Sequence, residues 1–202
     1  MFDETFRRAL PRFVRGPVRV LVRWGISPNQ VTIAAAGVGC AAGVLVAWGA
    51  AITGLALWLT SRLLDGVDGI LARETGRTSA FGGYLDITFD MLAYGVMLLG
   101  FWVRHPEAGW AWPAILLGYV LVTTSTLALS SILEGEHQQS VGGDRTIRFT
   151  PGLAEAGETS AAYVLFTLLP GFITPLAWTW AAMCAITVVQ RTVLARRLLR
   201  SP

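Results

Sequence analysis

Long apolar runs dominate this sequence and limit the folds open to it. Of its 202 residues, 53% are hydrophobic and 14% are charged, a balance that is unusual for a soluble domain. About twenty consecutive apolar residues cross the hydrocarbon core of a bilayer as a helix. Five such runs lie near residues 31–52, 54–73, 80–103, 110–133 and 175–196, and another run ends near residue 173. We therefore predict an all-α integral membrane protein with six transmembrane helices.

Residues 1–26 precede the first apolar run and mix apolar side chains with six arginines. This pattern is typical of a helix that lies in the headgroup layer, although Pro11 and Pro17 should break or kink it. We predict an N-terminal amphipathic juxtamembrane segment over residues 1–26 and a six-helix transmembrane domain over residues 27–202. The same arginines also fit a simpler interpretation, in which they only mark a cytoplasmic membrane edge.

The arginines indicate which side of the membrane each helix end faces. The formal net charge is +3, and all 16 basic residues are arginine. They flank the apolar runs, as at cytoplasmic membrane edges, so we do not expect nucleic-acid binding. Six spans place both termini on one side, together with Arg73, Arg77, Arg145 and Arg148, whereas Arg104 stands alone on the other side. We predict a multi-pass protein of the cytoplasmic (inner or plasma) membrane with both termini in the cytoplasm.

Four aspartates interrupt two of the apolar runs. Asp65 and Asp68 lie near the end of the second run, and Asp86 and Asp90 lie in the third. Charges at membrane depth are costly, so four of one sign close together indicate a function. Their spacing of three or four residues places each pair on one helix face. The loop between the two helices is short, which predicts antiparallel neighbours whose acidic faces meet.

A cluster of carboxylates suits hard divalent cations. We predict Mg²⁺ or Mn²⁺, with two ions, and no zinc because no His or Cys joins the set. Gly69 and Gly82 leave room for a ligand, and Arg73 offers a fork of donors to a phosphate. One alternative is a structural network in which Arg62, Arg73 and Arg77 pair with the aspartates. The other is a cation or proton transporter, whose carboxylates should be distributed across the membrane rather than gathered at one edge.

The acidic residues also form a recognisable pattern. It reads Asp65-Gly66-x-Asp68-Gly69-x-x-Ala72-Arg73, then eight residues, then Gly82-x-x-x-Asp86-x-x-x-Asp90. This pattern resembles the signature of the CDP-alcohol phosphotransferase (CDP-alcohol phosphatidyltransferase) family at every fixed position. The six-span layout, the cytoplasmic acidic edge and the turn Ser27-Pro28-Asn29-x-x-Thr32 also resemble that family, so the resemblance covers most of the chain.

The resemblance implies a catalytic transmembrane domain in which an alcohol attacks the β-phosphorus of a CDP-linked donor and expels CMP. It implies that Asp65, Asp68 and Asp86 hold the metals, and that Asp90 is a further ligand and the general base. The implied CMP-binding residues are Pro28, Asn29, Thr32, Asp68, Gly69, Ala72, Arg73 and Gly82. We expect a homodimeric enzyme of phospholipid synthesis that joins CDP-diacylglycerol to a small polar alcohol. The alternative donates a CDP-linked choline or ethanolamine head group to diacylglycerol.

The acceptor is less well specified by the sequence. Family members that use phosphorylated acceptors often share a Glu-Arg-x-x-Glu-Arg-like element at the start of the fifth span, and this chain has Glu155-Ala156-Gly157-Glu158-Thr159 there. This departure counts against inositol phosphate and glycerol phosphate. Candidate acceptor-binding residues are Arg145, Arg148, Glu155 and Glu158, and the two arginines equally fit a cytoplasmic membrane edge.

Overall fold

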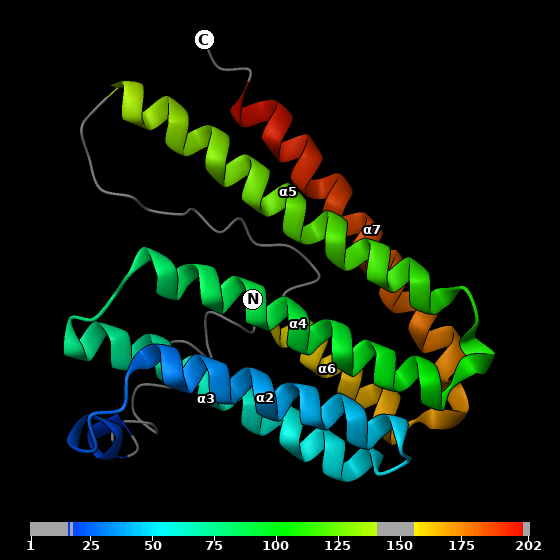
Figure 1. Ribbon diagram of the computed structural model, residues 1–202. Helices are drawn as coiled ribbons and strands as arrows, with labels where there is room; N and C mark the ends of the chain where they lie inside the picture. Colours follow the sequence, from blue (N-terminus) through cyan, green and yellow to red (C-terminus); the bar gives the residue numbers. More distant parts are fainter. Residues whose placement is uncertain (1–15, 17, 141–155, 200–202) are drawn as a thin grey trace. The chain divides into compact units, whose positions relative to one another are not determined.

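The computed structural model describes residues 16, 18–140 and 156–199, with side chains described outside residues 135–140. Every regular element in this part of the chain is helical (Figure 1), which confirms the predicted all-α class. The elements are α2 (Pro28–Ala47), α3 (Ala51–Thr75), α4 (Ala80–Arg104), η1 (Pro106–Ala108), α5 (Ala111–Ser140), α6 (Ala156–Leu168), η2 (Pro170–Phe172) and α7 (Ile173–Leu198).

Four stretches are long and apolar enough to cross a bilayer, and they are Pro28–Ala47, Ala80–Arg104, Ala111–Glu134 and Pro170–Leu198. They support a membrane protein. Helix α3 has 25 residues, but its C-terminal half is interrupted by charges. The described part of α6 has 13 residues, which extend over about 20 Å of a hydrocarbon core about 30 Å thick. The second and fifth spans therefore stay predictions. In the predicted N-terminal amphipathic segment, residues 18–23 are helical, and residues 1–15 and 17 lie outside the described part.

The start of α2 is fixed by its capping residues. Ser27 accepts a hydrogen bond from the Gln30 amide at 3.3 Å, and the Gln30 side chain accepts one from the Ser27 amide at 2.8 Å. Pro28 occupies the first helical position, where the missing N–H costs nothing. The helix consequently begins three residues earlier than the predicted apolar run, and this places Thr32 in its first turns.

The connection between α3 and α4 is as short as predicted. Gly76 ends α3 in the left-handed conformation with φ 65°, which glycine adopts without a steric penalty. Ser79 then caps α4 by accepting a hydrogen bond from the Gly82 amide at 3.0 Å. Only Arg77 and Thr78 lie between these two caps, so the chain reverses sharply and the acidic ends of α3 and α4 stay close together.

The described helices group into two compact units, and the first contains α2, α3, α4 and residues 163–171. Helix α2 packs against both α3 and α4 because its glycines allow close approach. A side chain at Gly43 would place its Cβ 2.5 Å from the Val96 carbonyl oxygen, and one at Gly39 would place it 2.9 Å from the Ala93 Cβ. Gly39 and Gly43 are therefore needed for the close approach of α2 to its neighbours. Helices α3 and α4 are neighbours, as predicted, and they meet through large side chains: the rings of Trp58 on α3 and Tyr94 on α4 have centroids 5.0 Å apart.

In the second unit α5 packs against α7. Trp180 donates an indole hydrogen bond to the Tyr119 hydroxyl at 3.0 Å. Arg191, which is 7% exposed, donates to the Val122 carbonyl at 2.7 Å and also to the Thr126 hydroxyl. Val122 and Thr126 both lie in the part of α5 that is apolar enough to span the membrane. The buried Arg191 guanidinium is therefore bound by neutral oxygens inside a candidate span. The sequence analysis did not single out Arg191, although an arginine inside an apolar run is a recognisable signal.

The turn into α7 is short. Pro170–Phe172 forms a single 3-10 turn, and α7 begins at Ile173. Pro175 lies in the first turn of α7. Proline is tolerated there because the first helical amides have no partner within the helix.

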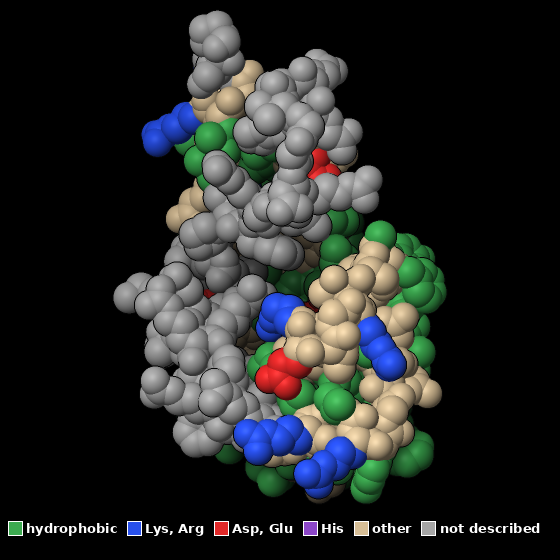
Figure 2. Space-filling model, turned by 90° about the vertical axis from the view of Figure 1, so that its left-hand side faces the viewer, with side chains coloured by type: hydrophobic (Ala, Val, Ile, Leu, Met, Phe, Trp, Pro, Cys, Tyr) green, Lys and Arg blue, Asp and Glu red, His purple; other side chains and the backbone are tan. Residues whose placement is uncertain are grey.

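Figure 2 shows the molecule from the side on which the α3–α4 turn lies, and arginine side chains gather on this face while apolar side chains cover much of the adjoining surface. Arg73 and Arg77 are both exposed near this turn. This distribution agrees with the arginine-rich edge that the sequence predicts.

Candidate active site

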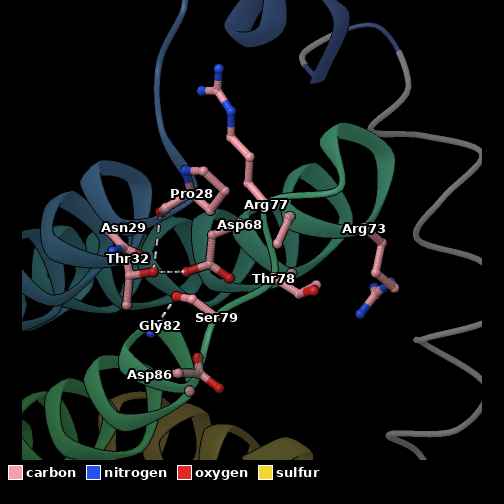
Figure 3. Close-up of a pocket in the computed structure, with 13 residues that line it drawn as sticks. Pro28, Asn29, Thr32, Asp68, Arg73, Arg77, Thr78, Ser79, Gly82 and Asp86 are labelled. Atoms are coloured by element: carbon pink, nitrogen blue, oxygen red, sulfur yellow. Dashed lines mark hydrogen bonds between the residues drawn. The ribbon is translucent and has the colours of Figure 1, made fainter.

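A cavity of about 240 Å³ lies at the acidic end of the first unit. The first turns of α2, the C-terminal half of α3 and the start of α4 all contribute to its wall (Figure 3). All the residues predicted to bind the nucleotide line it, and they are Pro28, Asn29, Thr32, Asp68, Gly69, Ala72, Arg73 and Gly82. The prediction missed Arg77, Thr78, Ser79 and Gly83, which also line the cavity, and the predicted metal ligand Asp86 lines it as well. For Arg77, Thr78 and Ser79, their position in a polar turn between the two halves of the acidic pattern was the available signal.

Three of the four aspartates come together beside this cavity. Asp65, Asp68 and Asp86 each offer a carboxylate oxygen, and these oxygens lie within 4.8 Å of one another. Ligand oxygens of an octahedral Mg²⁺ lie about 3 Å apart at adjacent positions and about 4.2 Å apart at opposite ones, so the three carboxylates have to move inward to share one ion. The donor set is entirely carboxylate oxygen, which fits a hard divalent cation better than zinc. Asp68 and Asp86 also line the cavity, so a cation held here lies next to any bound ligand.

Asp68 is the buried member of the group and is held by Thr32. Asp68 is 5% exposed, and its Oδ2 accepts a hydrogen bond from the Thr32 hydroxyl at 2.5 Å (Figure 3). Thr32 belongs to the capped start of α2, and its hydroxyl also lies 3.2 Å from the Pro28 carbonyl oxygen. One carboxylate oxygen of Asp68 is therefore anchored to a rigid helix end, and this fixes the orientation of the carboxylate beside the cavity.

Two glycines keep the cavity open in different ways. A side chain at Gly82 would bring its Cβ to 3.1 Å from the Ser79 hydroxyl and 3.2 Å from the Asn29 side-chain oxygen, so it would crowd the α4 cap. A Cβ at Gly69 would meet only the mobile end of Arg73, at 3.6 Å. Gly69 therefore leaves space that a ligand can fill. At Gly82 a larger residue would fill the cavity and would also crowd the side chains of Ser79 and Asn29.

Asp90 has an arginine partner. Its Oδ1 accepts a hydrogen bond from Arg62 at 2.5 Å, and the same guanidinium nitrogen lies 3.9 Å from Asp65. Of the four carboxylates that we predicted to converge, Asp65, Asp68 and Asp86 bring oxygens within 4.8 Å of one another, and Asp90 is linked to Asp65 through this shared arginine. Pairing with Arg62 was part of the structural-network alternative. The other arginines of that alternative, Arg73 and Arg77, point away from Asp68 and Asp86 (Figure 3).

The predicted acceptor residues are placed only in part. Arg145, Arg148 and Glu155 lie outside the described residues. Glu158 lies in the first turn of α6 and is half-buried, and it belongs to the second unit. The cavity beside the aspartates belongs entirely to the first unit.

Comparison with known proteins gives one consistent result. Residues 25–190 match the model of the CDP-alcohol phosphatidyltransferase family. The inner membrane protein YnjF of Escherichia coli is 33% identical over 198 residues, which cover 95% of this chain and 93% of YnjF. The archaetidylinositol phosphate synthase of Methanothermobacter thermautotrophicus is 29% identical, with 93% of this chain and 91% of the synthase covered.

Solved structures share the fold. The crystal structure of Mycobacterium tuberculosis phosphatidylinositol phosphate synthase with CDP-DAG bound matches with a TM-score of 0.72 and 23% identity, covering 91% of this chain and 94% of that one. A second structure of the same synthase, in complex with manganese and citrate, matches with a TM-score of 0.71, covering 89% of this chain and 87% of that one.

Proposed function

The chain belongs to the CDP-alcohol phosphatidyltransferase family, and we propose that the cavity beside Asp68 and Asp86 is its active site. The enzyme is a metal-dependent transferase of phospholipid synthesis, which moves a phosphatidyl group from CDP-diacylglycerol to a small polar alcohol and releases CMP. The observation that carries the assignment of the site is that the predicted nucleotide-binding residues all line one cavity, next to three clustered carboxylates.

We propose that Asp65, Asp68 and Asp86, with Asp90 as a further ligand, hold the divalent cation, which is Mg²⁺ or Mn²⁺, and that two ions bind. When bound, the cation neutralises the charge of the donor's pyrophosphate. Thr32 fixes the orientation of Asp68, so the ligand oxygen is positioned before substrate arrives. Gly69 and Gly82 let the CMP half of the donor approach the backbone of α3 and α4. Positioning and charge neutralisation of this kind supply most of the barrier reduction in phosphoryl transfer.

Asp90 is proposed as the general base. The acceptor's hydroxyl oxygen attacks the β-phosphorus, the bond between that phosphorus and the CMP oxygen breaks, and the hydroxyl proton passes to Asp90. The Asp90 side chain is 24% exposed, so a soluble alcohol can reach it. Its Oδ1 is occupied by Arg62, which leaves Oδ2 as the oxygen that takes the proton.

For the acceptor we propose a phosphorylated polyol of the inositol phosphate class. This proposal rests on the relatives, whose names describe archaetidylinositol phosphate and phosphatidylinositol phosphate synthases. Arg145, Arg148, Glu155 and Glu158 are the proposed acceptor contacts. An unphosphorylated alcohol is the second candidate. Enzymes with phosphorylated acceptors typically have arginines at the start of the fifth span, whereas this chain has residues such as Ala156 and Thr159 there.

The remaining proposals concern the membrane and the assembly. We propose that six helices span the membrane, that both termini and the cavity face the cytoplasm, and that the enzyme is a homodimer. We also keep the division into an amphipathic segment at 1–26 and a catalytic domain at 27–202. The arginine-rich edge next to the cavity supports the cytoplasmic orientation, because CMP and soluble alcohols are found there.

The deciding experiment uses the purified full-length protein in lipid nanodiscs. It is incubated with CDP-diacylglycerol, Mg²⁺ and either serine, inositol, glycerol phosphate or inositol phosphate, and CMP release and the lipid product are measured. We expect CMP release with inositol phosphate and none from Asp68→Asn. Turnover with CDP-choline and diacylglycerol in place of CDP-diacylglycerol would overturn the donor assignment, and activity with inositol alone would overturn the phosphorylated acceptor.

A further inference from the structure

Arg62 adds a permanent positive charge to the acidic group. It lies three residues before Asp65 on α3, outside the family pattern, and its side chain is 12% exposed. Guanidinium groups stay protonated in proteins. We propose that Arg62 makes the two cation sites unequal, because the ion that Asp65 and Asp90 help to hold must share these carboxylates with the arginine. The inference rests on the proposed function and deepens it, because it concerns how the same site takes up its two ions.

The guanidinium of Arg62 links two of the proposed ligands. Its Nη1 donates to Oδ1 of Asp90 at 2.5 Å and lies 3.9 Å from Oδ2 of Asp65. Asp68 is held in a different way, because its hydrogen-bond donor is the neutral hydroxyl of Thr32. One side of the acidic group therefore has a neutral partner, and the other side has a cationic one.

Other contacts hold this arginine in place independently of the aspartates. Its Nη2 donates to the Ser61 hydroxyl at 3.1 Å, and that hydroxyl donates to the Ala35 carbonyl at 2.8 Å. Its Cζ lies 4.7 Å from the ring centroid of Trp58 and 5.0 Å from that of Tyr94, within the range of cation–π attraction. Ser61 and Trp58 are fully buried. The guanidinium therefore stays beside the carboxylates when a cation binds, because moving it away would break these contacts as well.

A positive charge at this position weakens the binding of a nearby cation. Like charges a few ångströms apart repel strongly in a partly buried site, and the repulsion decreases with distance. It therefore acts more on the ion next to Asp90 than on the ion next to Asp68. A small part of the interaction energy expected at such distances corresponds to a factor of about ten in a binding constant, so we expect the two affinities to differ by at least that factor.

The donor can restore the affinity of the second ion. A pyrophosphate carries negative charge that offsets the charge of the guanidinium, and it adds phosphate oxygens of the kind that Mg²⁺ prefers as ligands. The weaker ion therefore binds together with the donor. In this way Arg62 keeps the second ion from occupying the site before the donor is present.

The test counts the Mn²⁺ ions that bind to the full-length protein in nanodiscs of zwitterionic lipid, by electron paramagnetic resonance without substrate. The wild-type protein should bind one ion tightly and a second at least about tenfold more weakly. Arg62→Gln removes the charge and keeps a polar side chain, so it should bind the second ion at least about tenfold more tightly than the wild type does. Addition of CDP, which carries the pyrophosphate without the lipid, should tighten the second ion more in the wild type than in Arg62→Gln.

Two variants serve as controls. Arg62→Lys keeps the charge and should keep the two affinities unequal. Arg104→Gln makes the same chemical change as Arg62→Gln at the end of α4, about 27 Å along the helix from Asp86, and should leave both affinities unchanged.

Several results would overturn the inference. They are two ions of equal affinity in the wild type, a second ion bound by Arg62→Gln within twofold of the wild-type affinity, or a single ion in both proteins even with CDP. If Arg62→Gln does not fold, the wild-type titration with and without CDP still decides, because equal affinities would exclude the effect of the arginine. Failure of the wild-type enzyme to release CMP from CDP-diacylglycerol would instead refute the proposed function, since the Mn²⁺ titration does not depend on turnover.

Discussion

The hydrogen bond from Thr32 to Asp68 offers the sharpest test of how this site is organised. Thr32→Val replaces the hydroxyl by a methyl group of nearly the same volume, so the packing of α2 against α3 is retained. Thr32 is 6% exposed and Asp68 is 5% exposed, so water has little access to replace the lost donor. A hydrogen bond to a charged group contributes about 1.5–3 kcal/mol, and this one orients a carboxylate that belongs to the cation-binding group.

The expected consequence is weaker cation binding. Loss of a partner that orients a metal ligand typically lowers metal affinity about 10- to 100-fold, which agrees with the hydrogen-bond energy because about 1.4 kcal/mol corresponds to a factor of ten. Mn²⁺ titration of the purified protein, followed by electron paramagnetic resonance, measures this directly. The activity assay should show a higher Mg²⁺ concentration at half-maximal rate, with kcat largely recovered at saturating Mg²⁺.

Thr60→Val is the matched control for this experiment. Thr60 lies on α3, is exposed, and donates to the Ala56 carbonyl within its own helix at 2.8 Å. It makes the same chemical change without touching an aspartate, so Mn²⁺ affinity should be unaltered. If Thr32→Val binds Mn²⁺ as tightly as Thr60→Val does, then Asp68 does not depend on Thr32, and the assignment of Thr32 as an orienting residue is wrong.

Three further changes test other parts of the argument. Asp90→Asn should lower CMP release by a factor of about 10² to 10⁴, the usual contribution of a general base, while Mn²⁺ binding persists; a normal rate would exclude Asp90 as the base. Gly43→Ala should lower the thermal unfolding midpoint, because its Cβ would press on the Val96 carbonyl and overpacking costs about 1–3 kcal/mol; an unchanged midpoint would contradict the close α2–α4 contact. Tyr163→Phe removes the hydrogen bond to Tyr94 and should cost about 1 kcal/mol in thermal unfolding, with the KM for CDP-diacylglycerol unchanged.

Much of the cavity could be predicted because its residues follow short-range rules. The α3–α4 turn is short, so any residues one or two helical turns from it on the facing sides must lie near each other. Capping by Ser27 and Ser79 similarly follows from local sequence. These two features together place Thr32, Asp68 and Gly82 around one cavity, as the motif implied.

The position of Asp90 could not be predicted in the same way. Helical spacing assigns Asp86 and Asp90 to one face of α4, but a face covers several ångströms and does not fix the side-chain partner. The partner is Arg62, which the sequence presents only as one of three nearby arginines. Its guanidinium lies 4.7 Å from the Trp58 ring on its own helix and 5.0 Å from the Tyr94 ring on α4, and Trp58 in turn contacts Tyr163, which is distant in the sequence.

The partner of Asp90 bears directly on its proposed role as the base. A carboxylate bound to divalent cations is stabilised in its charged form and becomes a weaker base, and a positively charged arginine acts in the same direction. In this structure Asp65, Asp68 and Asp86 bring oxygens within 4.8 Å of one another, and Oδ1 of Asp90 accepts a hydrogen bond from Arg62. Asp90 therefore has to take the acceptor's proton in a positively charged environment. Precise positioning of the hydroxyl against the carboxylate, rather than the strength of the base, must then supply most of the acceleration.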